Sequence, residues 1–270
     1  MIIDDTSRTI FIHVPKCAGS LVRHRLQPSK ENAAAPKKQL CEHMELGLID
    51  YGHIPLFILR AYFPEDYSKV QRYATYAVIR DPYTRFPSSF SQYLKHYGRA
   101  PIKDLSVREL RDELDSVIHL LKDYSEDYSY LPYKYIHFQR QRDFIYDGRE
   151  RLVDHVYDMS NIETMISDIE GRLTGGLREG SRTSSATVNE TVVYRGRIAR
   201  HMYGGAKRVL TPYLSHEARK TLRSGFRNWF HVSRDKKLLD IFYSQSVRGF
   251  VEEYYGCDIK VYQDVSGTTV

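Results

Sequence analysis

Three apolar runs, each followed by a turn and a helix-prone segment, constrain the fold of this chain more than any other feature. The first run, residues 9–14, reads Thr-Ile-Phe-Ile-His-Val, and residues 73–79 form a similar second run. A third run, residues 152–157, precedes a capping cluster and a helix-prone stretch over 162–173. Uninterrupted β-rich runs are typical of strands covered on both faces. Their alternation with helices predicts an α/β protein with an open, mostly parallel sheet flanked by helices.

The whole chain is expected to form one domain, because 270 residues suffice for one sizeable core. Residues 1–190 are predicted to be an α/β core, and residues 191–270 a mainly helical C-terminal part. Pro- and Ala-rich residues 28–39 are expected to form a surface loop, and residues 174–190 a mobile loop. An apolar stripe between residues 238 and 254 has near-helical spacing, which predicts packing against the sheet.

Composition excludes several classes of protein. The 3 cysteines include no Cys-x-x-Cys pair, so a disulfide framework or structural zinc site is not expected, and a reducing compartment fits better. A net charge of +6 suits an anionic ligand but is weak for a nucleic-acid-binding protein. The sequence shows no secretory signal, no membrane-spanning apolar stretch and no metal-binding motif. We therefore expect a cytoplasmic protein that needs no metal and binds no nucleic acid.

The loop after the first run has the composition of a phosphate-binding turn. It reads Pro15-Lys16-Cys17-Ala18-Gly19-Ser20. Small residues allow backbone N–H groups to approach an oxyanion, the following helix adds a favourable dipole, and the lysine adds a charge. The order of residues differs from a Walker A loop. The alternative is a purely structural one, a tight strand–helix turn with a surface lysine.

The same loop also permits a second function. Cys17 and Arg23 satisfy the Cys-x5-Arg pattern of cysteine-dependent phosphatases, in which a thiolate attacks phosphorus. Against this alternative, Pro15 and Lys16 separate the cysteine from the strand. It also leaves the motif after the second run unexplained.

That second motif is Arg80-Asp81-Pro82-Tyr83-Thr84-Arg85-Phe86-Pro87-Ser88. Asp81 is a good N-cap, and Pro82 suits the first position of a helix. Asp81 and Arg85 are expected to form an ion pair on that helix. Both motifs follow the carboxyl ends of predicted parallel strands, where open α/β sheets bind ligands.

Together the two motifs resemble the donor-binding pair of the sulfotransferase superfamily. The nearest likeness is to carbohydrate sulfotransferases whose first motif is of the Phe-Ile-His-Val-Pro-Lys type, here Phe11 to Lys16. The resemblance covers roughly residues 8–190 and is most specific at the two motifs. It implies a P-loop-like fold, 3′-phosphoadenosine 5′-phosphosulfate as the sulfuryl donor, and a hydroxylated, glycan-like acceptor.

The resemblance also implies which residues hold the donor. The 5′-phosphosulfate is assigned to Lys16, Cys17, Ala18, Gly19 and Ser20, and the 3′-phosphate to Arg80 and Ser88. An arginine fork with a hydroxyl is a suitable phosphate receptor and distinguishes this donor from ATP. Lys16 is further implied in catalysis, through the charge that it places on the leaving phosphate.

Histidines supply the remaining implied functions. His53, in Tyr51-Gly52-His53, matches a family Gly-His and is implied as the general base, a role that suits an imidazole at neutral pH. A hydrogen-bonded loop histidine is the alternative. His137 and Gln141 resemble a downstream family segment and are implied on the acceptor side. His13 is expected to be a buried structural histidine.

Two departures from the family pattern bear on the site. Cys17 stands where threonine or serine is commonest, which removes a hydroxyl contact. Pro87 precedes Ser88 inside the predicted helix and removes a backbone hydrogen bond, so that Ser89 is a possible substitute for Ser88. A non-catalytic nucleotide-binding module would keep both motifs without needing His53.

Overall fold

The computed structural model describes residues 1–26, 40–100, 102–173, 193–194, 231–232 and 240–267. The chain divides into two compact units, Met1–Val188 with Ser244–Val270, and Asn189–Tyr243. The predicted C-terminal part, residues 191–270, is therefore shared between the two units. The expected loops at 28–39 and 174–190 lie outside the described residues, as do residues 195–230 and 233–239 of the expected helical stretch. In the second unit, strands β9 (Val193–Tyr194) and β10 (His231–Val232) pair antiparallel.

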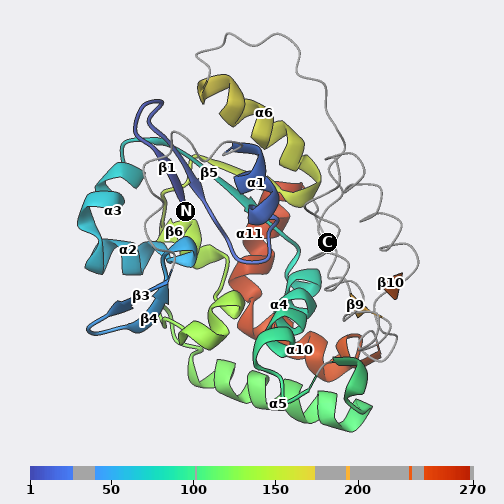
Figure 1. Cartoon of the computed structure of the whole chain (residues 1–270). Coiled ribbons are helices and arrows are strands. Elements are labelled where there is room, and N and C mark those ends of the chain that lie inside the picture. The colour runs from blue at the N-terminus through green and yellow to red at the C-terminus, as the bar shows by residue number, and fades with distance from the viewer. Residues whose placement is uncertain (27–39, 101, 174–192, 195–230, 233–239, 268–270) are drawn as a thin grey trace, which may run out of the picture. The chain divides into compact units, whose positions relative to one another are not determined.

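A four-stranded sheet in the order β1-β2-β5-β8 lies at the centre of the first unit (Figure 1). Its strands are β1 (Ile2–Asp4), β2 (Thr9–Ile12), β5 (Ala74–Ile79) and β8 (His155–Asp158). β2 pairs parallel with β5, and β5 pairs parallel with β8, whereas β1 is antiparallel to β2. The prediction of an α/β protein with a mostly parallel sheet is confirmed, and the antiparallel edge strand makes the sheet mixed.

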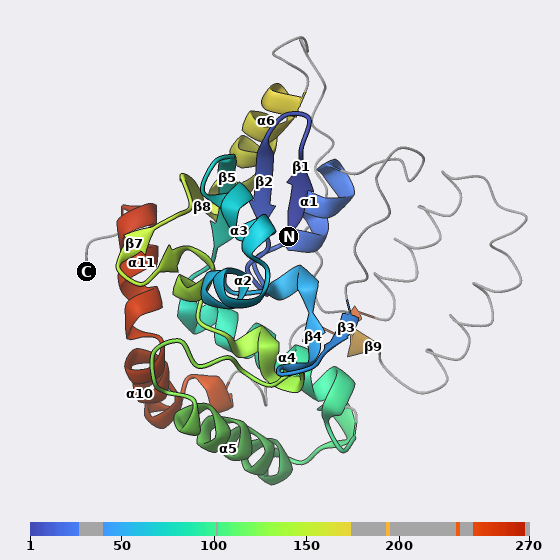
Figure 2. The same cartoon turned by 90° about the vertical axis from the view of Figure 1, so that its left-hand side faces the viewer.

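Helices cover both faces of this sheet, and further helices pack beyond its edge. The helices described in this unit are α1 (Gly19–Leu26), α2 (Leu56–Tyr62), α3 (Pro64–Val70), α4 (Pro82–Tyr97), α5 (Val107–Asp123), α6 (Ile162–Leu173), α10 (Gln245–Tyr254) and α11 (Gly256–Ser266). Two views at right angles show α2 and α3 on one side of the sheet and α1 and α6 on the other (Figures 1 and 2). Since both faces are covered, all four residues of β2 are buried.

Short elements connect these helices and strands. Two hairpins pair β3 (Leu40–His43) with β4 (Gly47–Asp50), and β6 (Tyr146–Asp147) with β7 (Glu150–Arg151). The 3₁₀ turns are η1 (Tyr51–His53), η2 (Ile102–Asp104), η3 (Tyr133–Phe138), η4 (Arg142–Phe144) and η5 (Met159–Asn161). The β3–β4 hairpin leads directly into η1, and η3 packs against α4.

The apolar stripe near the C-terminus packs differently from the prediction. Phe250 of α10 lies 5.4 Å, between ring centroids, from Phe86 of α4. α10 therefore packs against α4, and the following helix, α11, contacts strand β8. Periodicity identifies the buried face of a helix but not the element that covers it, so the prediction that the stripe packs on the sheet was wrong for α10.

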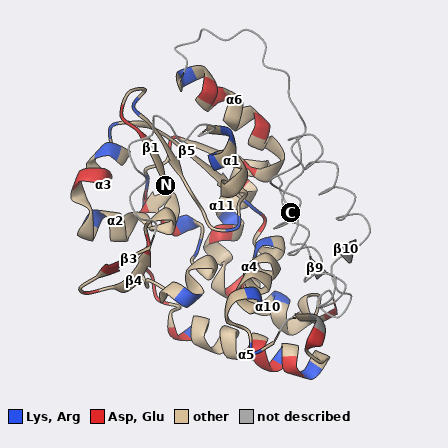
Figure 3. Cartoon of the chain, viewed as in Figure 1, with Lys and Arg blue, Asp and Glu red and all other residues tan. Residues whose placement is uncertain are grey.

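The helices of the first unit carry charges of both signs. In Figure 3, basic and acidic residues are interspersed along α5, whereas α6 is mostly acidic and has one arginine near its end. None of the helices in the described part of the chain combines the length and apolar character that a membrane crossing requires.

Candidate functional site

The loop after β2 adopts an unusual backbone conformation. Lys16 and Ala18 have φ angles of 66° and 57°, in the left-handed region that residues other than glycine rarely occupy. Each such residue costs about 1–3 kcal/mol unless its surroundings impose the conformation. Left-handed residues belong to the turns in which successive backbone N–H groups face an anion. The loop ends at Gly19, where α1 begins.

Lys16 lies among other cations. Burial lowers its pKa to about 8, and repulsion from Arg80 and Lys95 contributes to the shift. Arg80 follows the end of β5, and Lys95 lies near the end of α4. The neighbouring parallel strands therefore bring the lysine of the first motif and the arginine of the second to the same edge of the sheet. Lys95 was not predicted from the sequence because it belongs to neither motif.

The start of α4 matches the prediction. The Asp81 side chain accepts a hydrogen bond from the Tyr83 backbone N–H at 3.1 Å, and Pro82 is the first helical residue. Helix α4 continues through Pro87 without a break, so the helix does not begin late. The Arg80 guanidinium also donates to the Thr84 hydroxyl at 3.0 Å, which directs it along the first turn.

Ser88 and Ser89 differ in their surroundings. Ser88 is half-buried, and its hydroxyl makes no hydrogen bond within the described part of the chain. The hydroxyl of fully buried Ser89 donates to the His137 carbonyl at 2.8 Å. Ser89 therefore has a structural contact, and Ser88 remains the residue of this pair that is suited to a ligand.

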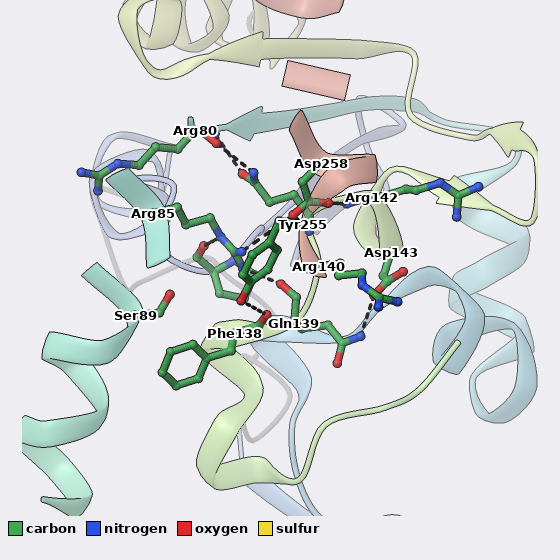
Figure 4. Close-up of polar contacts among 12 residues, drawn as sticks. Arg80, Arg85, Ser89, Phe138, Gln139, Arg140, Arg142, Asp143, Tyr255 and Asp258 are labelled. Atoms are coloured by element: carbon green, nitrogen blue, oxygen red, sulfur yellow. Dashed lines mark hydrogen bonds and ion pairs between the residues drawn. The ribbon is translucent and has the colours of Figure 1, made fainter. Parts of the chain in front are cut away.

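The predicted Asp81–Arg85 ion pair is wrong. Arg85 is 1% exposed, and its guanidinium lies 3.9 Å from the carboxylate of Asp258 in α11 (Figure 4). Its Nε donates to the Pro15 carbonyl at 3.0 Å and Nη2 donates to the Gln139 carbonyl at 2.5 Å. Arg85 is thus structural, as expected, but it ties the first motif to the C-terminal helix rather than to its own N-cap.

His53 lies beside a carboxylate. Its Nδ1 is 2.7 Å from Oδ2 of Asp50, the last residue of β4. Burial lowers the pKa of His53, although Asp50 opposes the shift. The imidazole is therefore neutral at pH 7, with Nδ1 held by the carboxylate and Nε2 left as the basic nitrogen. The sequence analysis missed Asp50, although its position three residues before His53 was a usable signal.

Two further histidines surround His53. The ring centroid of His13 is 4.3 Å from that of His53, and the ring centroid of His137 is 5.4 Å from that of His53. His13 is buried, as predicted, and its pKa lies well below the usual value because of burial and repulsion from His53. Burial and repulsion from His53 also lower the pKa of His137 to about 3. Histidines from three separate segments thus lie together, all neutral.

Gln141 contacts both predicted donor motifs. Its side chain is 1% exposed and hydrogen bonds to the backbone of Arg80 and to Cys17. It is placed between the two predicted donor motifs, whereas His137 is placed beside His53.

Cys17 lacks the properties of a nucleophile. Its side chain is 1% exposed and donates to Oε1 of Gln141 at 3.2 Å. Burial raises the pKa of the Cys17 thiol to about 11, because its effect is larger than the opposing effect of Arg85. A thiol protonated at neutral pH disfavours the phosphatase alternative, whose chemistry needs a thiolate.

Comparison with protein-family models, with curated proteins and with solved structures finds no match for this chain. Within the described residues, no three His, Cys, Asp or Glu side chains are arranged to hold a metal ion. The site combines three structural features. These are a strained loop of small residues, a group of cations and a neutral histidine oriented by a carboxylate.

Proposed function

We propose that this protein is a sulfotransferase, with a P-loop-like donor site, that transfers a sulfuryl group from 3′-phosphoadenosine 5′-phosphosulfate to a hydroxyl of a carbohydrate-like acceptor. The observation that carries the proposal is the proximity of the Lys16 loop (residues 15–20), Arg80 and the Asp50–His53 pair. Lys16 interacts with both Arg80 and His137, and the His137 ring lies 5.4 Å from that of His53. A nucleotide-binding module would need the first two features but not an oriented base. This difference favours an enzyme.

The proposed reaction assigns a task to each group. His53 accepts the proton of the acceptor hydroxyl at Nε2 while the hydroxyl oxygen forms a bond to sulfur. The bond between sulfur and the bridging oxygen breaks, and 3′-phosphoadenosine 5′-phosphate leaves with the electron pair. Lys16 and the loop N–H groups stabilise the charge that develops on the leaving phosphate. His137 would contact the acceptor, and its ring lies 5.4 Å from that of His53.

Donor recognition is assigned to the same edge. Lys16 through Ser20 would hold the 5′-phosphosulfate, and Arg80 with Ser88 the 3′-phosphate. Burial lowers the pKa of Lys16 to about 8, and repulsion by nearby cations adds to this shift. A bound anion would relieve that repulsion, because it neutralises part of the local charge.

Thermal unfolding with nucleotides tests the donor assignment. We expect 3′-phosphoadenosine 5′-phosphate to raise the melting temperature far more than AMP or ATP, because only it carries the 3′-phosphate. At about 100 times its Kd the ligand stabilises by about 2.7 kcal/mol. Arg80→Ala should reduce the preference, whereas Arg72→Ala, which alters an exposed arginine outside the site, should retain it. Equal shifts from all three nucleotides would contradict the proposal.

A further inference from the structure

The side chain of Gln141 connects the two motifs. Its Nε2 donates to the Arg80 carbonyl at 2.8 Å, and its Oε1 accepts from the Arg80 backbone N–H at 2.9 Å. The same Oε1 accepts from the Cys17 thiol at 3.2 Å. One buried amide therefore holds the residue that ends the second strand and a residue of the first loop.

Gln141 is itself fixed by the C-terminal helix. Its backbone N–H donates to Asp258 Oδ2 at 2.8 Å, and the Arg142 N–H donates to Oδ1 at 2.9 Å. The Asp258 carboxylate also pairs with Arg85, whose guanidinium donates to the Pro15 carbonyl (Figure 4). These contacts connect the first loop to the second motif along two routes, one through the side chain of Gln141 and one through Asp258 and Arg85. Asp258 therefore fixes the backbone of Gln141, while Arg80 and Cys17 fix its side-chain amide.

The contact with Arg80 resembles the pairing of a neighbouring strand. β5 pairs with β8 up to Ile79, and Arg80 is the next residue. The Gln141 amide presents one donor and one acceptor to the Arg80 backbone, as a peptide group of an adjacent strand would. The path of the chain at Arg80 therefore depends on this side chain, and loss of the amide would remove a hydrogen bond from the Arg80 N–H and another from its carbonyl.

We propose that Gln141 is a positioning residue that sets the separation between the Lys16 loop and Arg80. It acts on donor affinity rather than on the acceptor. The inference rests on the proposed function for the identity of the donor, and it assigns Gln141 differently from the acceptor-side role that the sequence implied. A neutral amide suits this position, because its Nε2 donates to the Arg80 carbonyl while its Oε1 accepts from the Arg80 N–H.

Gln141→Met tests the assignment, because it keeps an unbranched side chain of similar length and removes the amide. Gln139→Met is the matched control. Gln139 is also buried, and its side-chain amide hydrogen bonds to Leu131, Ser129 and Asp143. None of these three residues belongs to either motif. Calorimetric titration with 3′-phosphoadenosine 5′-phosphate should give a Kd roughly tenfold higher for Gln141→Met, the equivalent of one or two lost hydrogen bonds. The Kd of Gln139→Met should stay within about twofold of wild type at a similar loss of melting temperature.

Steady-state kinetics separate positioning from a general structural effect. Gln141→Met should raise the donor KM and leave the acceptor KM unchanged. Gln141→Glu keeps an oxygen for the Arg80 N–H and the Cys17 thiol, so its donor Kd should lie between those of wild type and Gln141→Met. This variant also serves if Gln141→Met fails to fold.

The possible failures are distinguishable. Wild-type protein that does not bind 3′-phosphoadenosine 5′-phosphate would overturn the proposed function and this inference with it. Normal wild-type binding, with unchanged donor Kd in folded Gln141→Met and Gln141→Glu, would overturn the positioning role alone. A rise in acceptor KM without a change in donor Kd would return Gln141 to the acceptor side.

Discussion

At the scale of single residues, the environment of His53 determines what its imidazole can do. Asp50 holds Nδ1 at 2.7 Å, and burial keeps the ring neutral. A neutral histidine with one nitrogen held is prepared to accept a proton at the other. The two neighbouring histidines add no positive charge at neutral pH, because burial and repulsion from His53 lower the pKa of both.

We expect His53→Ala to lower the transfer rate by roughly 10²–10⁴-fold, the usual contribution of a general base. Donor binding should survive, because His53 lies in neither donor motif. His24→Ala, which changes an exposed histidine of α1, should leave the rate unchanged. Rates measured with sulfur-labelled donor and a panel of hydroxylated acceptors would test both.

The pH dependence of kcat/KM should also reflect a general base at His53. The base acts when deprotonated, and the pKa of His53 lies below its usual 6.5. Wild-type kcat/KM should therefore be constant near pH 7 and fall as the pH drops through the lowered pKa, below 6.5. An active His53→Ala enzyme with an unaltered pH profile would remove His53 from the mechanism.

At the scale of elements, the junction of β2 with α1 depends on a close approach. A Cβ placed on Gly19 would lie 1.8 Å from Nε2 of His13, so the first residue of α1 must lack a side chain. His13 follows β2 directly, and the loop between β2 and α1 carries Lys16. The glycine therefore allows the helix to start where the loop can face the sheet edge.

Gly19→Ala should destabilise the protein by about 1–3 kcal/mol, the usual cost of overpacking a filled site. Gly249→Ala is the control, because nothing lies within 4 Å of a Cβ at that position inside α10. Alanine there should be neutral or stabilise the helix by up to about 1 kcal/mol. Urea denaturation compares Gly19→Ala with Gly249→Ala. The same measurement on His13→Ala, alone and combined with Gly19→Ala, gives the coupling between residues 13 and 19. If Gly19→Ala cost the same with and without His13, the steric explanation would be wrong.

At the scale of the whole molecule, α11 is attached to the candidate site through buried charge. Asp258 is 1% exposed and contacts Arg85 and two backbone N–H groups. Burial raises the pKa of Asp258, and Arg85 opposes that shift. The hydroxyl of buried Tyr255 also donates to the Phe138 carbonyl at 2.8 Å (Figure 4). The C-terminal helices therefore support the segment that carries His137 and Gln141.

Asp258→Ala should lower the free energy of unfolding by about 3–5 kcal/mol, because Arg85 would remain buried without its carboxylate. Asp264→Ala changes an exposed aspartate of the same helix and should cost less than about 0.5 kcal/mol. Equilibrium denaturation in urea compares the two variants. Equal free energies of unfolding for the two variants would show that the Arg85–Asp258 pair does not stabilise the protein.

Local features of the sequence determined much of this protein. The apolar runs predicted β2 and β5, and Asp81 with Pro82 predicted the start of α4. Parallel pairing then placed both motifs at one edge, because parallel strands share their carboxyl ends. These features depend on backbone preferences and side-chain periodicity within a few residues, and such preferences are present in the sequence itself.

Only the tertiary structure decided how the site is supported. The partner of Arg85, the position of Gln141 between the motifs and the packing of α10 on α4 all join segments far apart in the chain. A buried charge or amide takes whichever partner the packed chain brings near, and that partner leaves no periodic signal in the sequence. Local pattern therefore indicated where the candidate site lies, whereas burial and long-range hydrogen bonds determined which residues face it and which hold it in place.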